Sequence, residues 1–240
     1  LTDPGLRMQH EEITALLLRN GGLRGAAADV VRFPRGLVED ALSRCPREVV
    51  MANRQGDGSR LAPSGDSCVW SVPGMYVWEG GRHRLFTSDD MARMSRLLDR
   101  LEHVDGVFGM SLSDVPPTAR DVVGLRIMAE NTRKHIRVLC FTPQGADCLV
   151  RMREVVADNA WFSIGFTAHG PLRWTELALD IFHRTAGHGI PVSVNGEPMS
   201  GVSGPVTLAG SAAVGHAEIL AGIVVALLFA PGRPCIYNRG

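Results

Sequence analysis

The sequence predicts an α/β protein, about the first half of a (β/α)8 TIM-type barrel preceded by a small α+β region over residues 1–86. From residue 87 onward, short apolar segments alternate with longer helix-like segments, which is typical of parallel strands joined by helices. No G-x-G-x-x-G or G-x-x-x-x-G-K-[ST] motif marks a common nucleotide-binding sheet. Only five strands can be assigned after residue 87 and a closed barrel needs eight, so residues 87–240 are expected to hold its first βα units.

Residues 1–86 mix helix and strand patterns without a regular repeat. Apolar residues at helical spacing, capped by glycine or proline, indicate the helices, while β-branched and alternating residues indicate the strands. A Gly-Gly pair between two strand-like runs indicates a hairpin. The predicted elements are helices over residues 11–18 and 34–42, strands over 30–33, 49–51 and 68–72, and a hairpin over 76–86.

The second region begins with a helix near Thr87, because a hydroxyl residue followed by two aspartates suits a helix N-terminus. Alternating strands and helices then follow. The strands are short and apolar, so we expect helices to cover both faces of the sheet. The predicted strands are residues 104–110, 136–142, 161–166, 190–194 and 234–237, and the helices between them are residues 119–130, 144–157, 172–188 and 207–228.

Polar residues follow each predicted strand, and in a barrel the strand ends meet on the face that holds active sites. These residues are Ser111, Ser113, Asp114, Thr142, Thr167, His169, Asn195, Glu197, Ser200, Ser203, Tyr237 and Asn238. The alternative is that loops are polar only because water surrounds them. The residues predicted to bind substrate are Glu197, Ser200, His169, Thr167, Ser111, Thr142 and Tyr237. Glu197 and His169 are favoured because each lies within three residues of its strand, and no catalytic residue is assigned.

Two glutamates near the end of the chain allow more than one interpretation. Glu197 could hold a cation or move a proton, or it could cap the following helix or pair with an arginine. Glu218 lies in an otherwise apolar helix, so it is either exposed on a polar stripe or buried with a partner. The exposed stripe is favoured, since Ser211 and His216 are polar too. Gly210, Gly215 and Gly222 in this helix are expected to allow close packing against the sheet.

Composition excludes several functional classes. The formal net charge is zero and the 25 basic residues form no block, so neither nucleic acid nor an anionic membrane is an expected partner. The five cysteines are widely spaced, which predicts isolated reduced thiols in a cytoplasmic protein. The longest apolar run, residues 219–232, is shorter than the roughly 18–20 residues that span a bilayer. No H-E-x-x-H or G-x-S-x-G motif is present, and no metal site is predicted.

The chain begins without methionine and stops directly after a strand-like segment, which we interpret as a fragment. An open half-barrel exposes unpaired strand edges, and such edges associate with other chains. We therefore expect residues 1–240 alone to be poorly soluble or to form homo-oligomers.

Three segments near the end of the chain have a distinctive sequence. They are Met-Ser-Gly-Val-Ser-Gly-Pro-Val-Thr-Leu-Ala-Gly at 199–210, Ala-Glu-Ile-Leu-Ala-Gly-Ile-Val at 217–224, and Ala-Pro-Gly-Arg-Pro-Cys-Ile-Tyr at 230–237. These segments resemble the trimethylamine methyltransferase family. The preceding Gly-Ile-Pro-Val at 189–192 fits as well. Upstream, Asp-Pro-Gly-Leu-Arg at 3–7 and Phe-Pro-Arg-Gly-Leu-Val-Glu-Asp-Ala-Leu at 33–42 resemble the N-terminal part of that family.

The resemblance implies a (β/α)8 barrel considerably longer than this chain. It also implies transfer of a methyl group from a methylated or quaternary amine, such as trimethylamine or glycine betaine, to the cobalt of a corrinoid. That corrinoid is carried by a separate partner protein, so no cofactor is expected to bind this chain directly. One branch of the family contains pyrrolysine, at a position in later strands that this sequence does not include.

Two other interpretations remain open from the residues alone. The first is a different barrel enzyme, a lyase or isomerase of small acids, with Glu197 and His169 as its acid and base. The second is an inactive truncated remnant.

Overall fold

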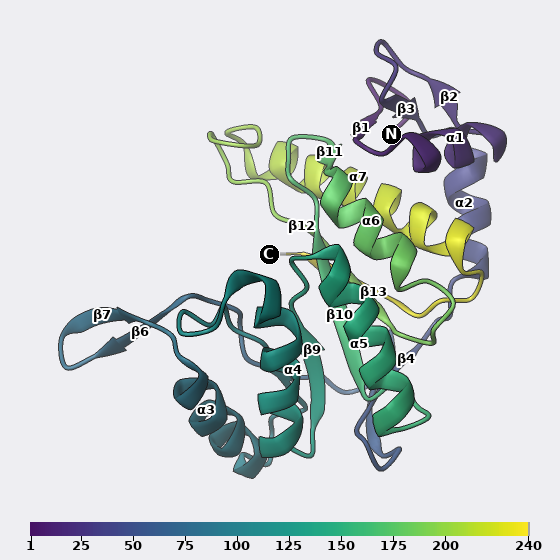
Figure 1. The fold of residues 1–240 in the computed structure, drawn as a ribbon. Helices are drawn as coiled ribbons and strands as arrows, with labels where there is room; N and C mark the ends of the chain where they lie inside the picture. The colour runs from purple at the N-terminus through teal and green to yellow at the C-terminus, as the bar shows by residue number, and fades with distance from the viewer. Residues whose placement is uncertain (240) are drawn as a thin grey trace. The chain divides into compact units, whose positions relative to one another are not determined.

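A computed structural model describes residues 1–239 and shows a mixed α/β protein (Figure 1). The chain divides into two compact units, each assembled from segments that are distant in sequence. Unit 1 contains Leu1–Pro46, Gly165–Gly187 and the chain from Val192 onward, whereas unit 2 contains Arg47–Ile164 and His188–Pro191.

Strands and helices alternate from α3 onward, as the sequence predicted. The strands are β1 (Leu6–Met8), β2 (Leu23–Arg24), β3 (Val30–Arg32), β4 (Val49–Ala52), β5 (Gly58–Leu61), β6 (Tyr76–Glu79), β7 (Arg82–Leu85), β8 (Gly106–Phe108), β9 (His135–Val138), β10 (Phe162–Thr167), β11 (Arg173–Trp174), β12 (Val192–Gly196) and β13 (Cys235–Arg239). The helices are α1 (Glu11–Arg19), α2 (Arg35–Arg44), α3 (Ser88–Arg100), α4 (Arg120–Asn131), α5 (Pro143–Val156), α6 (Glu176–Arg184) and α7 (Leu208–Phe229), with a short 3-10 helix, η1 (Pro117–Ala119), before α4.

The largest sheet has five strands in the order β13-β12-β10-β9-β8. The strand pairs whose register is described, β8–β9, β9–β10 and β12–β13, are all parallel. Sheet order therefore follows chain order, unlike a doubly wound sheet, in which the order reverses at a switch point. This order is consistent with part of a barrel.

Unit 1 also contains a four-stranded sheet with the order β11-β1-β3-β2, in which β1 pairs in parallel with β11. Its longest helix, α7, packs against β12 and α2. Among residues 1–239, α7 is the one helix long and apolar enough to cross a membrane by length and composition. The packing of α7 inside unit 1 is that of a core helix, and 56% of its most apolar window is buried.

Glycines allow α7 to approach β12 closely, as predicted for Gly215 and Gly222. A Cβ atom at Gly215 would lie 3.4 Å from the carbonyl oxygen of Gly196, at the end of β12. A Cβ atom at Gly222 would lie 2.5 Å from Val194 Cγ1. Gly210 differs, because the nearest atoms to its Cβ position belong to the preceding loop and not to the sheet.

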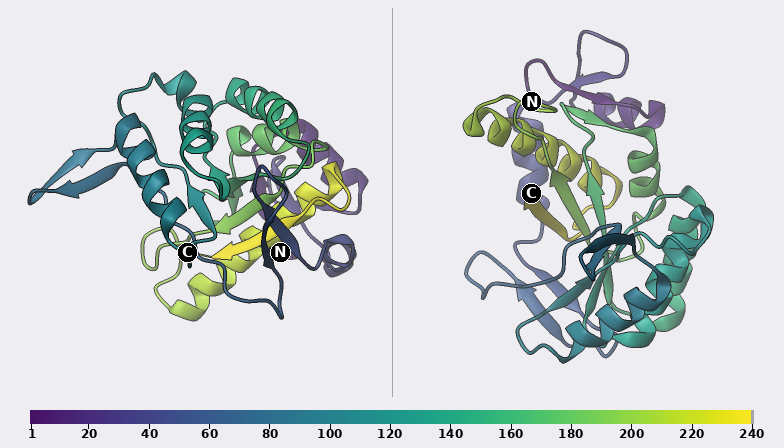
Figure 2. Two further views of the ribbon diagram at one scale, coloured as in Figure 1. Left: turned by 90° about the horizontal axis from the view of Figure 1, so that it is seen from below. Right: turned by 90° about the vertical axis from the view of Figure 1, so that its left-hand side faces the viewer.

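In unit 2, α4 packs between α3 and α5 (Figure 1). The hairpin β6–β7 turns at Gly80 and Gly81, both with positive φ, as the Gly-Gly pair predicted. This hairpin projects away from α3 and α4 in Figure 1 and in the left view of Figure 2. An isolated hairpin is only marginally stable in water, so its attachment to the rest of unit 2 is important.

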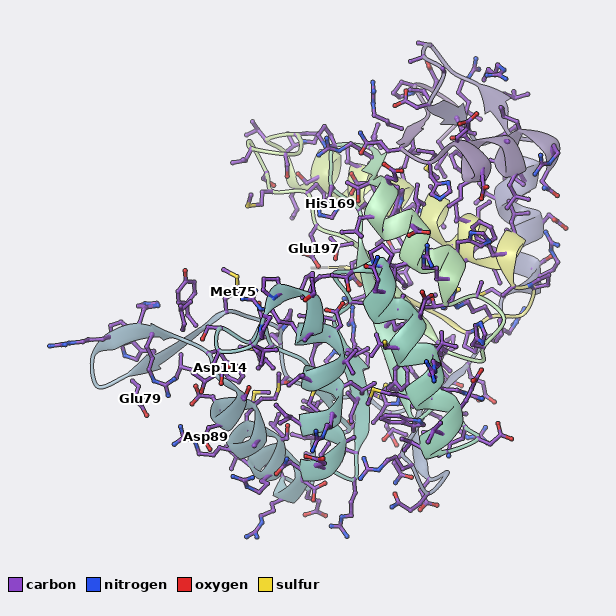
Figure 3. All side chains as sticks on the ribbon, in the orientation of Figure 1. Met75, Glu79, Asp89, Asp114, His169 and Glu197 are labelled. Carbon is purple, nitrogen blue, oxygen red and sulfur yellow. The ribbon has the colours of Figure 1, made fainter. Side chains whose placement is uncertain are left out.

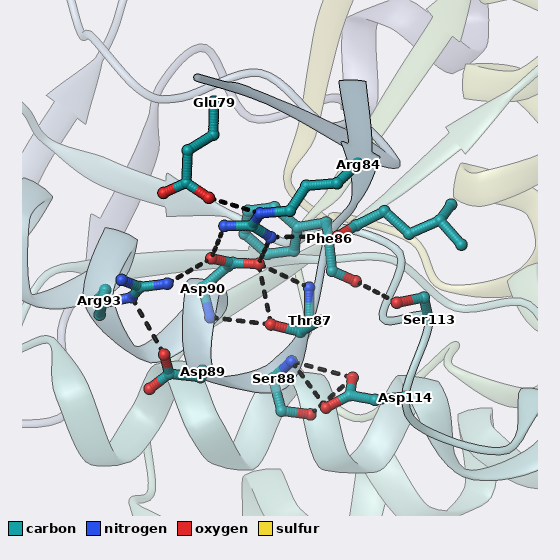
Figure 4. A network of polar contacts seen from close by, with 11 residues as sticks. Glu79, Arg84, Phe86, Thr87, Ser88, Asp89, Asp90, Arg93, Ser113 and Asp114 are labelled. Atoms are coloured by element: carbon teal, nitrogen blue, oxygen red, sulfur yellow. Dashed lines mark hydrogen bonds and ion pairs between the residues drawn. The ribbon is translucent and has the colours of Figure 1, made fainter. Parts of the chain in front are cut away.

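Asp90 attaches the hairpin to α3 (Figure 4). Arg84 of β7 donates two hydrogen bonds to the Asp90 carboxylate, the longer at 2.8 Å, and Arg84 Nε donates to Glu79 Oε2 at 2.7 Å. Asp90 also completes a capping box with Thr87, whose N–H donates to Asp90 Oδ2 at 3.0 Å. The Arg84 guanidinium, followed by these backbone and hydroxyl donors, holds the pKa of Asp90 well below its usual range.

We expect Asp90→Asn to lower the free energy of unfolding by about 2 kcal/mol at pH 7, because a capping carboxylate and its ion pair are lost together. A depressed folded-state pKa stabilises the fold above the unfolded value of about 4 and loses that contribution as the pH falls further. In urea titrations, the difference in free energy of unfolding between the variant and the wild type should therefore shrink as the pH falls below about 4. Asp89→Asn is the matched control, since Asp89 is exposed and its one ion pair within residues 1–239 is with Arg93. Equal effects of both substitutions would contradict the anchoring role.

Several predicted elements differ from the structure. The strands predicted over residues 104–110 and 136–142 are shorter and end at Phe108 and Val138. Residues 68–72 form no strand, only an isolated bridge at Trp70, because the Val69 N–H donates to the Asp105 carboxylate and not to a neighbouring strand. The helix predicted over residues 172–188 begins only at Glu176, since β11 occupies the preceding residues. Strand β12 continues to Gly196, where the sequence predicted a loop from residue 195.

The prediction of strands that are apolar on both faces is also wrong. On β9, His135 and Arg137 alternate with Ile136 and Val138, and all four residues are buried. His135 Nε2 lies 2.9 Å from Ser163 Oγ of β10. Burial lowers the pKa of His135 to about 4, so its imidazole is neutral at pH 7. One face of the sheet in unit 2 is therefore polar and buried.

The cysteines are all free thiols, but they are not all isolated. In unit 1 the thiol of Cys45, which follows α2, and that of Cys235 of β13 lie close enough to shift each other's pKa. The Cys235 thiol lowers the pKa of Cys45 to about 7, and the same contact together with burial raises the pKa of Cys235. The two cysteines are far apart in the sequence, so the cysteine spacing did not predict that they lie close together.

Candidate active site at the carboxyl ends of the strands

Strand β12 presents polar residues on one face and apolar residues on the other. Val194 faces α7, so its neighbours Ser193 and Asn195 point to the opposite face. Asn195 is paired in register with Asn238 of β13, and paired residues of adjacent strands point to the same face. The side chains of Ser193, Asn195 and Asn238 therefore gather on the face away from α7.

Asn195 links three strands through its side chain. Its Nδ2 donates to Thr167 Oγ1 of β10 at 3.1 Å, and its Oδ1 accepts from Asn238 Nδ2 and from Ser193 Oγ, both at 3.0 Å. Asn195 is only 4% exposed, so the surroundings hold its amide in one orientation. This polar row of Thr167, Asn195 and Asn238 offers fixed, uncharged donors and acceptors at the carboxyl ends of parallel strands, where ligands bind in such folds.

His169 lies two residues after the end of β10, Glu197 directly follows β12, and both are exposed (Figure 3). The His169 N–H donates to the Arg173 carbonyl at 2.9 Å, and Arg173 Nε donates back to the His169 carbonyl at 2.9 Å, which closes a tight loop after β10. Glu197 has no hydrogen bond or ion pair with any residue of the described chain, 1–239. Its carboxylate is thus free to meet a cationic ligand, and its predicted role stays a prediction.

Ser200 and Tyr237 are engaged by other residues of unit 1. Ser200 Oγ lies 3.0 Å from Ser211 Oγ of α7, which ties the loop that carries Ser200 to that helix. Tyr237 is paired in register with Val194 and so points to the α7 face, where its hydroxyl lies 3.0 Å from His216 Nδ1. Neither side chain bonds to the polar row, and for both the predicted contact with substrate remains a prediction.

Glu218 of α7 is buried and not exposed on a polar stripe, so the favoured sequence interpretation is wrong. Its Oε1 accepts the N–H of Leu172 at 2.7 Å, and its Oε2 has no partner within residues 1–239. Leu172 has a φ of 52°, an unusual conformation for a residue with a side chain. Burial raises the pKa of Glu218, and the Leu172 N–H opposes that shift. Glu218 thus holds the loop that carries His169.

In unit 2, Ser111 and Thr142 line one cavity of about 500 Å³ at the carboxyl ends of β8 and β9. The wall of the cavity is mostly apolar. Its other lining residues are Pro73, Gly74, Met75, Pro117, Arg120, Leu139 and Phe141. The structure therefore brings two of the predicted site residues together in a space large enough for a small molecule.

Thr142 already uses its hydroxyl inside the protein. It caps α5 by accepting the Gly145 N–H at 3.0 Å, and it donates to Asp121 Oδ2 at 3.0 Å. The same Asp121 oxygen accepts the N–H groups of Phe141 and Thr142. Burial raises the pKa of Asp121, while these donors oppose the shift. Thr142 therefore forms part of the cavity wall, and its hydroxyl is already hydrogen-bonded within the protein.

The sequence reasoning missed three residues that these sites contain. Ser193 was hidden inside a predicted apolar strand, although the alternation Val-Ser-Val-Asn at 192–195 was a signal for one polar face. Arg120 and Phe141 gave no signal, because an arginine at a helix start and an aromatic residue after a strand are both common.

A model of the trimethylamine methyltransferase family matches residues 1–239, nearly the whole chain. The chain belongs to this family. The sequence resemblance is thereby confirmed, and the family is one of methyltransferases. Among residues 1–239, no three His, Cys, Asp or Glu side chains are grouped so that they could hold a metal ion.

Named relatives agree with the family assignment. The chain is 26% identical to the trimethylamine methyltransferase MttB of Desulfitobacterium hafniense, over 98% of the chain and 49% of that protein. It is 29% identical to MttB of Methanosarcina barkeri, over 99% and 51%, and 23% identical to the proline betaine:corrinoid methyltransferase of Eubacterium limosum, over 99% and 52%. The chain thus spans about half the length of the curated relatives it matches.

The fold is similar to that of the monomethylamine methyltransferase of Methanosarcina barkeri. The TM-score is 0.56 at 14% sequence identity, and the match covers 91% of this chain and 49% of that structure. This trimethylamine methyltransferase family member therefore shares its architecture with about half of that enzyme.

Proposed function

We propose that the chain acts in the transfer of a methyl group from a methylated or quaternary amine to the cobalt of a corrinoid on a partner protein. The family match over residues 1–239 carries this proposal. The relatives named trimethylamine methyltransferase support a methylated amine as the donor. The relative named proline betaine:corrinoid methyltransferase supports a corrinoid as the acceptor. The alternatives of an acid–base barrel enzyme and of an inactive remnant predict no methyl transfer.

The chemistry asks little of the protein beyond positioning. A quaternary amine is a cation that leaves as a neutral amine, and the corrinoid supplies the nucleophile. The chain has to bind the amine, orient one methyl group toward the partner and exclude water. In unit 1, the polar row of Thr167, Asn195 and Asn238 can orient a polar ligand, while Glu197 supplies a free carboxylate for a cation.

We further propose the complete (β/α)8 barrel as the architecture, with residues 1–86 as its N-terminal extension and the later residues as its first βα units. The chain-ordered parallel sheet supports this arrangement. Free thiols at all five cysteines support a cytoplasmic location. The edge strand β13 of the five-stranded sheet supports association of the chain with copies of itself.

The test is a methyl-transfer assay with the purified protein and a corrinoid protein reduced to Co(I), followed by the absorbance change on methylation of cobalt. We expect demethylation of at least one of trimethylamine, glycine betaine, carnitine and proline betaine. Glu197→Gln should raise the Kd of that amine about fivefold, because an exposed ion pair of roughly 1 kcal/mol would be lost. Absence of transfer from all four amines would contradict the function, and an unchanged Kd would limit Glu197 to a structural role.

A further inference from the structure

The hairpin β6–β7 of unit 2 has one charged face and one apolar face. Successive residues of a strand point to opposite faces, and cross-strand partners point to the same face. Arg84 donates to the Asp90 carboxylate of α3, so the face that carries Arg84 lies toward α3 (Figure 4). The opposite face carries the cross-strand pairs Tyr76–Leu85 and Trp78–His83. We call these four residues the apolar face of the hairpin.

The apolar face is exposed, which reverses the usual arrangement. In antiparallel sheets with one covered face, apolar side chains normally lie against the protein and polar side chains face water. Here Tyr76 is 54%, Trp78 65% and Leu85 51% exposed, and no acidic or basic side chain other than the histidine belongs to the face. The rings of Trp78 and His83 are in T-shaped contact, with centroids 4.8 Å apart. An exposed, continuous apolar surface of this kind marks an interaction site.

We propose that a second copy of this chain covers the apolar face, with the two hairpins packed face to face about a two-fold axis. In such a contact the same patch is used by both copies, so an apolar face without carboxylates or arginines matches itself. The formal net charge of the chain is zero, so copies do not repel one another at long range. The hairpin is stabilised too, because two strands alone are marginal in water and a covering layer shields them.

The size of the surface fits a reversible dimer. The four side chains of the apolar face expose roughly 500 Å² in one chain, so a symmetric pair would bury about 1,000 Å² in total. That area lies near the lower limit for specific protein–protein interfaces. The dimer is therefore expected to dissociate at micromolar concentrations.

The turn of the hairpin favours a protein surface over a membrane as the partner. Glu79 and Arg82 flank the two turn glycines, and both are exposed. Insertion of this tip into lipid would remove two charged side chains from water at a high cost. The apolar face runs along the strands and leaves both charges at the end of the hairpin, which suits a second β-ribbon laid across it.

Sedimentation velocity of the 240-residue chain between about 1 and 100 μM measures the association. The wild type should change from monomer to dimer across this range. Trp78→Thr keeps a good strand former and should raise the dimer Kd by about tenfold or more, because the largest ring of the face is lost. Leu97→Gln is the matched control. Leu97 of α3 is 61% exposed and lies outside the apolar face, so its replacement should leave the Kd unchanged.

A second variant and a salt series complete the design. Leu85 lies on the other strand of the same face, so Leu85→Thr should also weaken the dimer, by about threefold to tenfold. Raising NaCl from about 0.05 to 0.5 M should leave the wild-type Kd unchanged or lower it, whereas an association through ion pairs would weaken. Melting curves at about 1 μM, where the chain is monomeric, should show that each variant is folded.

Three outcomes would overturn the proposal. The first is a wild type that stays monomeric up to about 100 μM. The second is an assembly that neither Trp78→Thr nor Leu85→Thr weakens, because the copies would then meet elsewhere, for example at β13 of unit 1. The third is binding to vesicles of phosphatidylcholine and phosphatidylserine that Trp78→Thr abolishes, which would assign the face to a membrane. The apolar face belongs to unit 2 and the proposed amine site to unit 1, so methyl transfer is measured separately from each outcome.

Discussion

Gly222→Val is expected to lower the free energy of unfolding by about 3 kcal/mol, or the melting temperature by roughly 6–12 °C. A Cβ atom at residue 222 would lie 2.5 Å from Val194 Cγ1 and 2.6 Å from Trp174 Cζ2, far inside normal contact distances. Both neighbours are completely buried and cannot move into solvent. Because Val194 belongs to β12 and Trp174 to β11, the added methyl groups would push α7 away from two sheets of unit 1 at once.

Gly222→Ala and Gly36→Ala separate packing from helix propensity. Alanine raises helix propensity by about 1 kcal/mol at an interior position such as Gly222, and by less at Gly36, the second residue of α2. At Gly36 of α2 no atom lies within 4 Å of the Cβ position, so this variant should be slightly more stable than the wild type. At Gly222 the clash should outweigh the gain and leave a net loss of about 1–2 kcal/mol. Differential scanning calorimetry measures all three variants, and a melting temperature of Gly222→Val near that of the wild type would mean that the core relaxes around the added atoms.

The sequence predicted correctly those elements whose stabilising contacts are between residues close together in the chain. Thr87 was predicted to begin a helix, and it forms a full capping box with Asp90. Gly80 and Gly81 were predicted to form a hairpin turn, and both adopt the positive φ that such turns require. In these cases the interacting residues are at most a few positions apart, so the pattern contains the whole interaction.

The parts of the fold that failed prediction depend on distant partners. Residues Arg173 and Trp174 form a strand because β1, more than 160 residues earlier, supplies the hydrogen bonds. Asn195 lies inside a strand although asparagine is typical of loops, because Thr167 and Asn238 of neighbouring strands bond its amide. No pattern within one segment contains these pairings.

The candidate site was predictable only in part for the same reason. Polar residues at the ends of strands were taken as site candidates, and this rule identified Thr167, which bonds to Asn195. It also identified Ser111 and Thr142, which line the same cavity. The rule could not tell which face of a strand each residue occupies. Tyr237 follows the rule and yet points to α7, because the register with β12 decides its face.

Glu218 gives the second prediction, because its buried carboxylate makes stability depend on pH. The N–H of Leu172 is the one donor described for this carboxylate, and its Oε2 is unpartnered within residues 1–239. Burial raises the pKa of Glu218, so the folded chain retains a proton that the unfolded chain releases above a pH of about 4. The contribution of Glu218 to stability is therefore complete below that pH and is lost as the pH rises through the folded-state value.

Glu218→Gln should remove this dependence, since a neutral amide can still accept the Leu172 N–H through its oxygen. Urea unfolding at pH 4.5, 6 and 8 measures the free energy of unfolding. Relative to the wild type, that of the variant should rise by about 1–2 kcal/mol from the lowest to the highest pH. Glu197→Gln is the control, because Glu197 is exposed and should leave the pH profile unchanged. Parallel profiles for wild type and Glu218→Gln would contradict a buried, perturbed carboxylate.

Glu218→Ala tests what the carboxylate does for the site. Without an acceptor the Leu172 N–H loses its bond, and a partly buried donor left unpaired costs about 1–3 kcal/mol. The Leu172 carbonyl keeps its hydrogen bond from the Arg7 N–H at 2.9 Å, but the N–H side of Leu172 loses its acceptor, so the loop from Ala168 to Arg173 should loosen on the side that faces α7 and His169 should shift with it. Hydrogen exchange should then show faster exchange at Leu172 and His169 and unchanged exchange at Val194 of β12. Protection of Leu172 equal to that of the wild type would mean that the pairing of β1 with β11, and not Glu218, holds this loop.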